Sequence, residues 1–192
     1  MKKKLLVTLL ALSLAAGSLA PVSPLDNTAV VAEAAKKKPK KKTPSVNKIY
    51  KAVVAKFGEG YLADLKLTKD EIKLRYGISS SWYTDIIAEI PMMSAHVDTL
   101  IIAKAKNKTA KTKIKKKLTS YRQALVKDTN QYPMNLMKIQ ASKVYVKDNY
   151  VFFIMLGSID TKLEETGTDE QILEAYKKEN QKAISAINAQ FK

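Results

Sequence analysis

Residue types that could perform catalysis are scarce in this sequence. It contains no cysteine, and His96 is its single histidine. This composition excludes zinc sites built from cysteine or several histidines, and it excludes a Cys–His dyad. Ser94 and Asp98 each lie two residues from His96, so on a strand all three side chains would point to the same face. A catalytic triad needs the acid at one nitrogen of the imidazole and the serine at the other, and neighbours along one strand do not produce this geometry. A triad at His96 is therefore disfavoured, and without a phosphate-binding glycine loop, dinucleotide fingerprint or EF-hand, no cofactor or metal ion is expected.

Three carboxylates form the other catalytic candidate. Asp85 and Glu89 have the same parity in an alternating segment, and Asp98 in the next segment could face them. Glycoside hydrolysis uses two carboxyl groups about 5 to 10 Å apart, so Asp85, Glu89 and Asp98 are the candidates for a wall-glycan hydrolase. The favoured alternative is that these acids pair with lysines across strands, for roughly a few tenths of a kcal/mol each. The lysines concerned are Lys104, Lys106, Lys143 and Lys147.

Lysines supply the strongest signal in the sequence. The formal net charge is +16 at pH 7, and a chain this basic is attracted to polyanions. Lysines at the start of a helix oppose its dipole and repel one another, so helix stability does not explain the basic cluster around residues 108–117. The candidate anion-binding residues form two groups, Lys36, Lys37, Lys38, Lys40, Lys41 and Lys42 in a tail and Lys113, Lys115, Lys116 and Lys117 in a helix.

The expected anion is a cell-wall polymer or a membrane surface. Nucleic acid is disfavoured because aromatic residues that could stack on bases are not interleaved with the basic run. Near an anionic membrane each lysine contributes about 1 kcal/mol, and salt screens this attraction. Pro39 interrupts the run from Lys36 to Lys42 and disfavours an amphipathic helix there. The run is therefore either a flexible electrostatic tether or a solvated spacer.

The N-terminal segment has the pattern of a secretory signal peptide. Three lysines at positions 2–4 precede an apolar stretch over 5–16, and residues 32–34 supply an A-x-A cleavage pattern. The mature chain is expected to begin at Ala35, the alternative being an uncleaved anchor. Cleavage removes three lysines and two acids, which leaves a formal charge of +15. The predicted location is extracellular or associated with the cell wall.

Apolar periodicity divides the rest of the chain into helices and strands. Helical spacing and caps predict helices over 46–57, 68–77 and 107–127 and from 168 to the end of the chain. Strands are predicted over 82–90, 96–106, 142–147 and 150–156, the last two joined by a hairpin at Asp148-Asn149. The prediction is an α+β domain with a four-stranded antiparallel sheet and helices mainly on one face, in the order α-β-β-α-β-β-α.

The composition and apolar periodicity also predict how the chain is divided. A signal peptide occupies 1–34, a disordered linker rich in lysine and proline occupies 35–44, and the α+β domain occupies 45–160. A loop and a C-terminal amphipathic helix fill 161–192.

The order of several segments carries a resemblance. They are "VNKIYKAVVAKFG", "YGISSSWYTDIIAEIPMMSAHVDTLIIAKAKN", "YRQALVKDTNQYP" and "SKVYVKDNYVFFIML". Over about residues 46–160 this layout resembles a domain-of-unknown-function family of secreted proteins and lipoproteins from Gram-positive bacteria. The resemblance implies location and fold, and it brings no established activity. Asp98 and Arg122 match the family's pattern, whereas Thr99 stands where it often has glutamate and Asp148 where it often has glycine.

These observations favour a secreted, non-enzymatic domain held electrostatically at the cell envelope. Two alternatives stay open. One is a carboxylate-based wall-glycan hydrolase, and the other is an accessory domain that binds an exported protein through its C-terminal helix.

Overall fold

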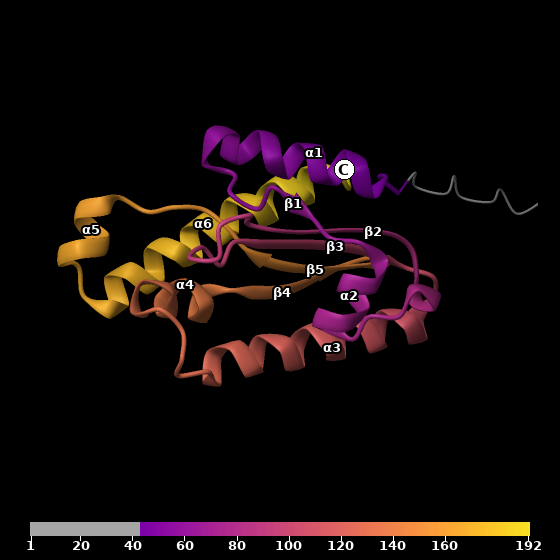
Figure 1. Ribbon diagram of the computed structural model, residues 1–192. Coiled ribbons are helices and arrows are strands. Elements are labelled where there is room, and N and C mark those ends of the chain that lie inside the picture. The colour runs from indigo at the N-terminus through magenta and orange to yellow at the C-terminus, as the bar shows by residue number, and fades with distance from the viewer. Residues whose placement is uncertain (1–42) are drawn as a thin grey trace, which may run out of the picture. The chain divides into compact units, whose positions relative to one another are not determined.

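A computed structural model describes residues 43–192 (Figure 1). Its α-helices are α1 (Val46–Phe57), α2 (Lys69–Tyr76), α3 (Lys108–Lys127), α4 (Leu136–Ala141), α5 (Thr161–Thr166) and α6 (Asp169–Ala189). Its strands are β1 (Leu65–Lys66), β2 (Tyr83–Ile90), β3 (Thr99–Ala105), β4 (Lys143–Lys147) and β5 (Tyr150–Met155). Among these described helices, none is long and apolar enough to cross a membrane. The predicted signal peptide and the lysines from 36 to 42 lie outside the described residues.

The strands form one antiparallel sheet in the order β1-β2-β3-β5-β4. The predicted α+β class and antiparallel sheet are confirmed, but the predicted count of four strands is wrong. The fifth strand, β1, pairs Leu65 with Ile90 and Lys66 with Glu89 at the outer edge of β2. Two residues are too few to produce a visible alternation, so this strand leaves no signal in the sequence.

Helices cover both faces of the sheet, and the prediction that they lie mainly on one face is wrong (Figure 1). Ile101 and Phe153 lie opposite each other on β3 and β5 and pack with residues of α2 and α3. Their neighbours Ile102 and Phe152 point to the other face and pack with residues of α1 and α6. Every residue of β5 is buried, and a strand that is apolar on both faces needs a cover on each of them.

Side-chain caps fix the predicted helix starts. Thr68 and Glu71 form a capping box at α2, and Thr168 and Gln171 form another at α6. α1 begins after Ser45, whose hydroxyl accepts a hydrogen bond from the backbone of the third helical residue. Because each cap satisfies a backbone N–H group that lacks a partner within the helix, these starts are readable from the sequence.

The end of the predicted linker belongs to the folded part. Pro44, which lies within the predicted disordered segment 35–44, is buried, and its carbonyl oxygen accepts a hydrogen bond from the hydroxyl of Tyr150. Tyr150 is fully buried on β5. The linker prediction is therefore wrong at Pro44, because composition does not reveal a contact between residues 106 positions apart.

Candidate functional site

Helix α3 presents one apolar face to the sheet and a lysine-rich face to the outside. Ala110, Ile114 and Leu118 are buried, and they repeat at the spacing of one helical face. The helix starts at the N-cap Asn107, whose side-chain oxygen accepts a hydrogen bond of 2.8 Å from the Ala110 amide. Its 20 residues extend over about 30 Å. The first turn contains no acidic residue.

The four predicted anion-binding lysines of α3 are all exposed. The Lys113 ammonium lies 5.5 Å from the ring centroid of Trp82, a cation–π contact. Lys117 lies against Gly77, the left-handed residue that ends α2, and a Cβ at that glycine would be 3.2 Å from its ammonium. A positive charge beside the C-terminal end of a helix is favourable. These two lysines therefore have local structural contacts, and Lys115 and Lys116 add two further exposed charges to the helix.

The positive charge of α3 is not neutralised by carboxylates. Within residues 43–192, the ion pairs are Lys138–Asp98, Lys177–Glu174 and Lys182–Glu179, and none of them involves α3. Lys111 of this helix donates instead to the carbonyl oxygen of Asp148, at 2.8 Å. We call the exposed side chains of Lys113, Lys115, Lys116 and Lys117 the α3 lysine face. The second predicted group, at 36–42, lies outside the described residues.

Asp85 is the exposed member of the three candidate acids. It lies opposite Lys104 in the register of β2 and β3, but the Lys104 ammonium lies over the Tyr150 ring, 5.7 Å from its centroid. Asp85 lines a cavity of about 420 Å³ beside the start of α2, and neither Glu89 nor Asp98 lines that cavity. In the described part of the chain, no cluster of three or more His, Cys, Asp or Glu side chains could hold a metal ion.

Glu89 is buried on the same strand and has a protein partner. Its Oε2 accepts a hydrogen bond of 2.8 Å from the hydroxyl of Tyr61. Burial raises the pKa of the Tyr61 phenol well above its usual range, and the negative charge of Glu89 raises it further. The carboxylate is thus held by a neutral phenol in the interior and does not face a cleft shared with Asp85.

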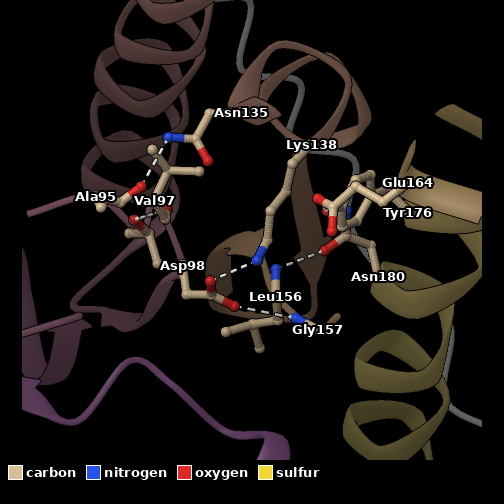
Figure 2. A network of polar contacts seen from close by, with 11 residues as sticks. Ala95, Val97, Asp98, Asn135, Lys138, Leu156, Gly157, Glu164, Tyr176 and Asn180 are labelled. Atoms are coloured by element: carbon tan, nitrogen blue, oxygen red, sulfur yellow. Dashed lines mark hydrogen bonds and ion pairs between the residues drawn. The ribbon is translucent and has the colours of Figure 1, made fainter. Parts of the chain in front are cut away.

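Asp98 lies at the centre of a buried polar network just before β3 (Figure 2). Its Oδ2 is 2.5 Å from the Lys138 ammonium, and its Oδ1 accepts a hydrogen bond of 3.1 Å from the Gly157 amide. The predicted partners, which were lysines on neighbouring strands, are wrong for this acid. Its partner is on α4, a six-residue helix that the sequence analysis did not predict.

The polar groups around this ion pair also have hydrogen-bond partners. Asn180 of α6 accepts a hydrogen bond from the Leu156 amide and donates one to the Ala141 carbonyl, both at 3.0 Å. The Lys138 ammonium lies 5.5 Å from the ring centroid of Tyr176. Figure 2 shows these groups converging from four segments of the chain. Because each oxygen of Asp98 has a donor, the arrangement is that of a structural network.

Lys138 is the residue of this network that sequence reasoning missed. Its signal was the single charged residue in the mostly apolar segment "MNLMKIQA", and its side chain is 6% exposed. Asp98 is engaged with Lys138, whereas His96 and Ser94 are exposed. The structure therefore does not assemble Ser94, His96 and Asp98 into a triad.

A family model described as Domain of unknown function (DUF4358) matches residues 58–156. The chain belongs to the DUF4358 family. This confirms the family resemblance seen in the sequence. The DUF4358 segment contains the whole sheet, α3 and the Asp98–Lys138 pair, whereas α1 and α6, which cover one face of the sheet, lie outside it. No curated protein and no solved structure matches this chain.

Proposed function

We propose that this protein is an exported, non-enzymatic DUF4358 protein that binds an anionic polymer or lipid surface of the cell envelope through lysines. The observation that carries the proposal is the α3 lysine face, whose charges have no carboxylate partner within residues 43–192. The signal-peptide pattern at 1–34 supports delivery outside the cytoplasmic membrane, where teichoic acids and anionic headgroups are abundant polyanions.

The geometry of α3 suits a repeating anion. The α3 lysine face covers about 6 Å of the helix axis, at about 1.5 Å per residue, and its long side chains can contact neighbouring phosphates of a polymer at once. Each such contact is weak and screened by salt, so affinity comes from their number. Long lysine side chains adapt to a flexible polymer without a shaped pocket. The tail lysines at 36–42 add six charges to the same attraction.

The carboxylate arrangement supports binding over hydrolysis. A glycosidase needs two acids that face one cleft. Glu89 and Asp98 are buried and engaged with Tyr61 and Lys138, which leaves Asp85 as the exposed acid of the three. Similarly, the apolar face of the C-terminal helix is already occupied, because Ala183, Ile184 and Ile187 pack into the core with residues of α1. We therefore place the polymer contacts on α3.

Co-sedimentation with purified cell walls tests this proposal. We expect the chain from Ala35 onward to sediment with walls that carry teichoic acid at low salt, to be released as salt rises, and to stay in solution with walls stripped of the polymer. A variant with the six tail lysines changed to serine shows whether the tail is an electrostatic tether or a spacer. Weaker retention of this variant assigns the tail to binding, and unchanged retention makes it a spacer. Absence of retention by the parent protein at low salt contradicts the proposal.

A further inference from the structure

We propose that the loop between β2 and β3 binds Cu(I), a soft monovalent metal ion, through the thioethers of Met92 and Met93 and the imidazole of His96. The proposal is independent of the anion-binding function. The three residues lie within five positions of one another, and all are exposed, Met92 at 73% and Met93 at 62%. Two adjacent methionines directed to solvent are unusual, because methionine is among the residues most often buried.

The three side chains share the same space. Met92, Met93 and His96 all line a cavity of about 290 Å³, and all three also line a neighbouring cavity of about 380 Å³. The three side chains therefore surround a shared space, and the proposed site forms when their rotamers turn the three donor atoms toward one ion. Two sulfur atoms and one nitrogen atom provide a three-donor set.

Hydrogen bonds hold the loop in shape. The His96 amide donates to the carbonyl of Met93 at 3.2 Å, which closes a turn that brings these two residues together. Asn135 donates from its side chain to the carbonyl of Ala95 at 2.9 Å, as Figure 2 shows. Two residues after His96, the chain is fixed by the buried Asp98. A loop that is already ordered loses little conformational entropy when its side chains bind an ion.

The smaller cavity is locally acidic in a strongly basic protein. Glu59 and Asp64 contribute to its lining, and no lysine or arginine does, although the chain carries a formal charge of +16. Asp64 also accepts a hydrogen bond of 3.1 Å from the Met92 amide, so a carboxylate lies directly beside the loop. On the side of the smaller cavity the charge near the three donors therefore favours a cation, whereas Arg75 lines the larger cavity. Carboxylates of this kind can act as outer-shell partners of a bound imidazole.

The donor types select the metal. Thioethers are soft, neutral ligands, and soft sulfur ligands favour Cu(I) over hard ions such as Mg²⁺ or Ca²⁺. Imidazole nitrogen also suits copper. The absence of cysteine excludes thiolate zinc sites, but it does not bear on thioether coordination. The proposed step is binding alone, with no change in the oxidation state of the metal.

An exposed methionine pair could also be part of an apolar contact surface for another protein, and substitution by leucine distinguishes the two roles. Leucine keeps the apolar surface and nearly the same volume but lacks sulfur. Met134 is a matched control, because it is 62% exposed and lines neither cavity. The variants are therefore Met92→Leu/Met93→Leu, His96→Asn and Met134→Leu.

The test is anaerobic titration of the full chain with Cu(I) in competition with bicinchoninate, a chromophoric Cu(I) chelator. We expect one Cu(I) per chain, an affinity at least about tenfold weaker in Met92→Leu/Met93→Leu and His96→Asn, and no change in Met134→Leu. In NMR spectra, the methyl signals of Met92 and Met93 should shift on addition of Cu(I), while that of Met134 stays. Failure of the parent protein to compete for Cu(I), or equal binding by the double leucine variant, overturns the proposal. Circular dichroism confirms that each variant is folded.

Discussion

The ammonium of Lys138 lies 2.5 Å from Oδ2 of Asp98, forty residues earlier in the chain, and both side chains are buried. The other carboxylate oxygen accepts a hydrogen bond from Gly157. This arrangement joins α4, the start of β3 and the segment after β5. Because a buried charge is tolerated only with a partner, each residue depends on the other.

Removal of one partner of this pair should be costly. We expect Asp98→Ala to lower the free energy of unfolding by about 3–5 kcal/mol, since it leaves the Lys138 ammonium buried and unpaired. The double variant Asp98→Asn/Lys138→Met should recover most of this loss, because it removes both charges. Urea unfolding followed by circular dichroism measures each value. A double variant as unstable as the sum of the single variants Asp98→Asn and Lys138→Met contradicts the pairing.

Gly157 should tolerate no side chain. Its φ is +93°, and a Cβ there would lie 2.7 Å from the Cβ of Glu179. Gly157→Ala should therefore lower the free energy of unfolding by about 2 kcal/mol or more. Gly60→Ala is the control, because no atom lies within 4 Å of a Cβ at that position, and it should change stability by less than about 0.5 kcal/mol. Equal changes in melting temperature for the two variants would rule out the close approach at Gly157.

Glycine at position 148 should make the β4–β5 turn more stable. Asp148 has φ +49°, a left-handed conformation in which an L side chain is strained. Asp148→Gly should raise the free energy of unfolding by about 0.5–1 kcal/mol, while Asp148→Val, with a branched side chain, should lower it. Both variants keep the backbone carbonyl that Lys111 contacts. Chemical unfolding at pH 7 checks the order glycine, aspartate, valine, and a valine variant as stable as the parent would contradict this account.

Buried tyrosines make the fold sensitive to alkali. Burial raises the pKa values of Tyr61 and Tyr76 above their usual value near 10, and the charge of Glu89 adds to the rise at Tyr61. A phenol with a raised pKa in the folded state contributes stability below the pKa of the unfolded state, and this contribution is lost as pH rises past about 10. The tyrosinate absorbance at 295 nm that comes from the buried tyrosines should therefore increase together with the loss of circular dichroism, whereas exposed tyrosines such as Tyr132 ionise before it. Full ionisation of the tyrosines near pH 10 in an intact fold would contradict the burial.

The longer elements could be predicted from the sequence because each repeats its pattern several times. The 12 residues of α1 and the 20 residues of α3 have regular apolar spacing and polar N-caps, and both were predicted within one residue. By contrast, α4, α5 and β1 have six, six and two residues, which is too short for a period to appear. The sequence of β5, which is apolar throughout, indicates that both faces of the sheet are covered. The apolar pattern of a helix, however, does not show which face of the sheet that helix covers.

The candidate site could be predicted only in part, for a related reason. The α3 lysines are visible as a run of charge, so the sequence identifies the surface. The partners of single residues depend on contacts distant in the chain. Examples are the cation–π contact of Lys113 with Trp82, the hydrogen bond from Tyr61 to Glu89 and the ion pair of Lys138 with Asp98. No local sequence pattern predicts such a pairing. The pairing of Lys138 with Asp98 was also missed because helix α4, which contains Lys138, was not predicted.

A charge-matched comparison tests the central claim that the α3 lysine face binds an envelope polyanion. Lys115→Gln/Lys116→Gln and Lys177→Gln/Lys182→Gln each remove two positive charges, but the second pair lies on α6, where both lysines are ion-paired with glutamates. We predict that co-sedimentation with teichoic-acid-bearing walls at moderate salt falls several-fold for the α3 variant and stays close to the parent for the α6 variant. Equal retention of the two variants would show that net charge alone governs binding and would contradict a site on α3.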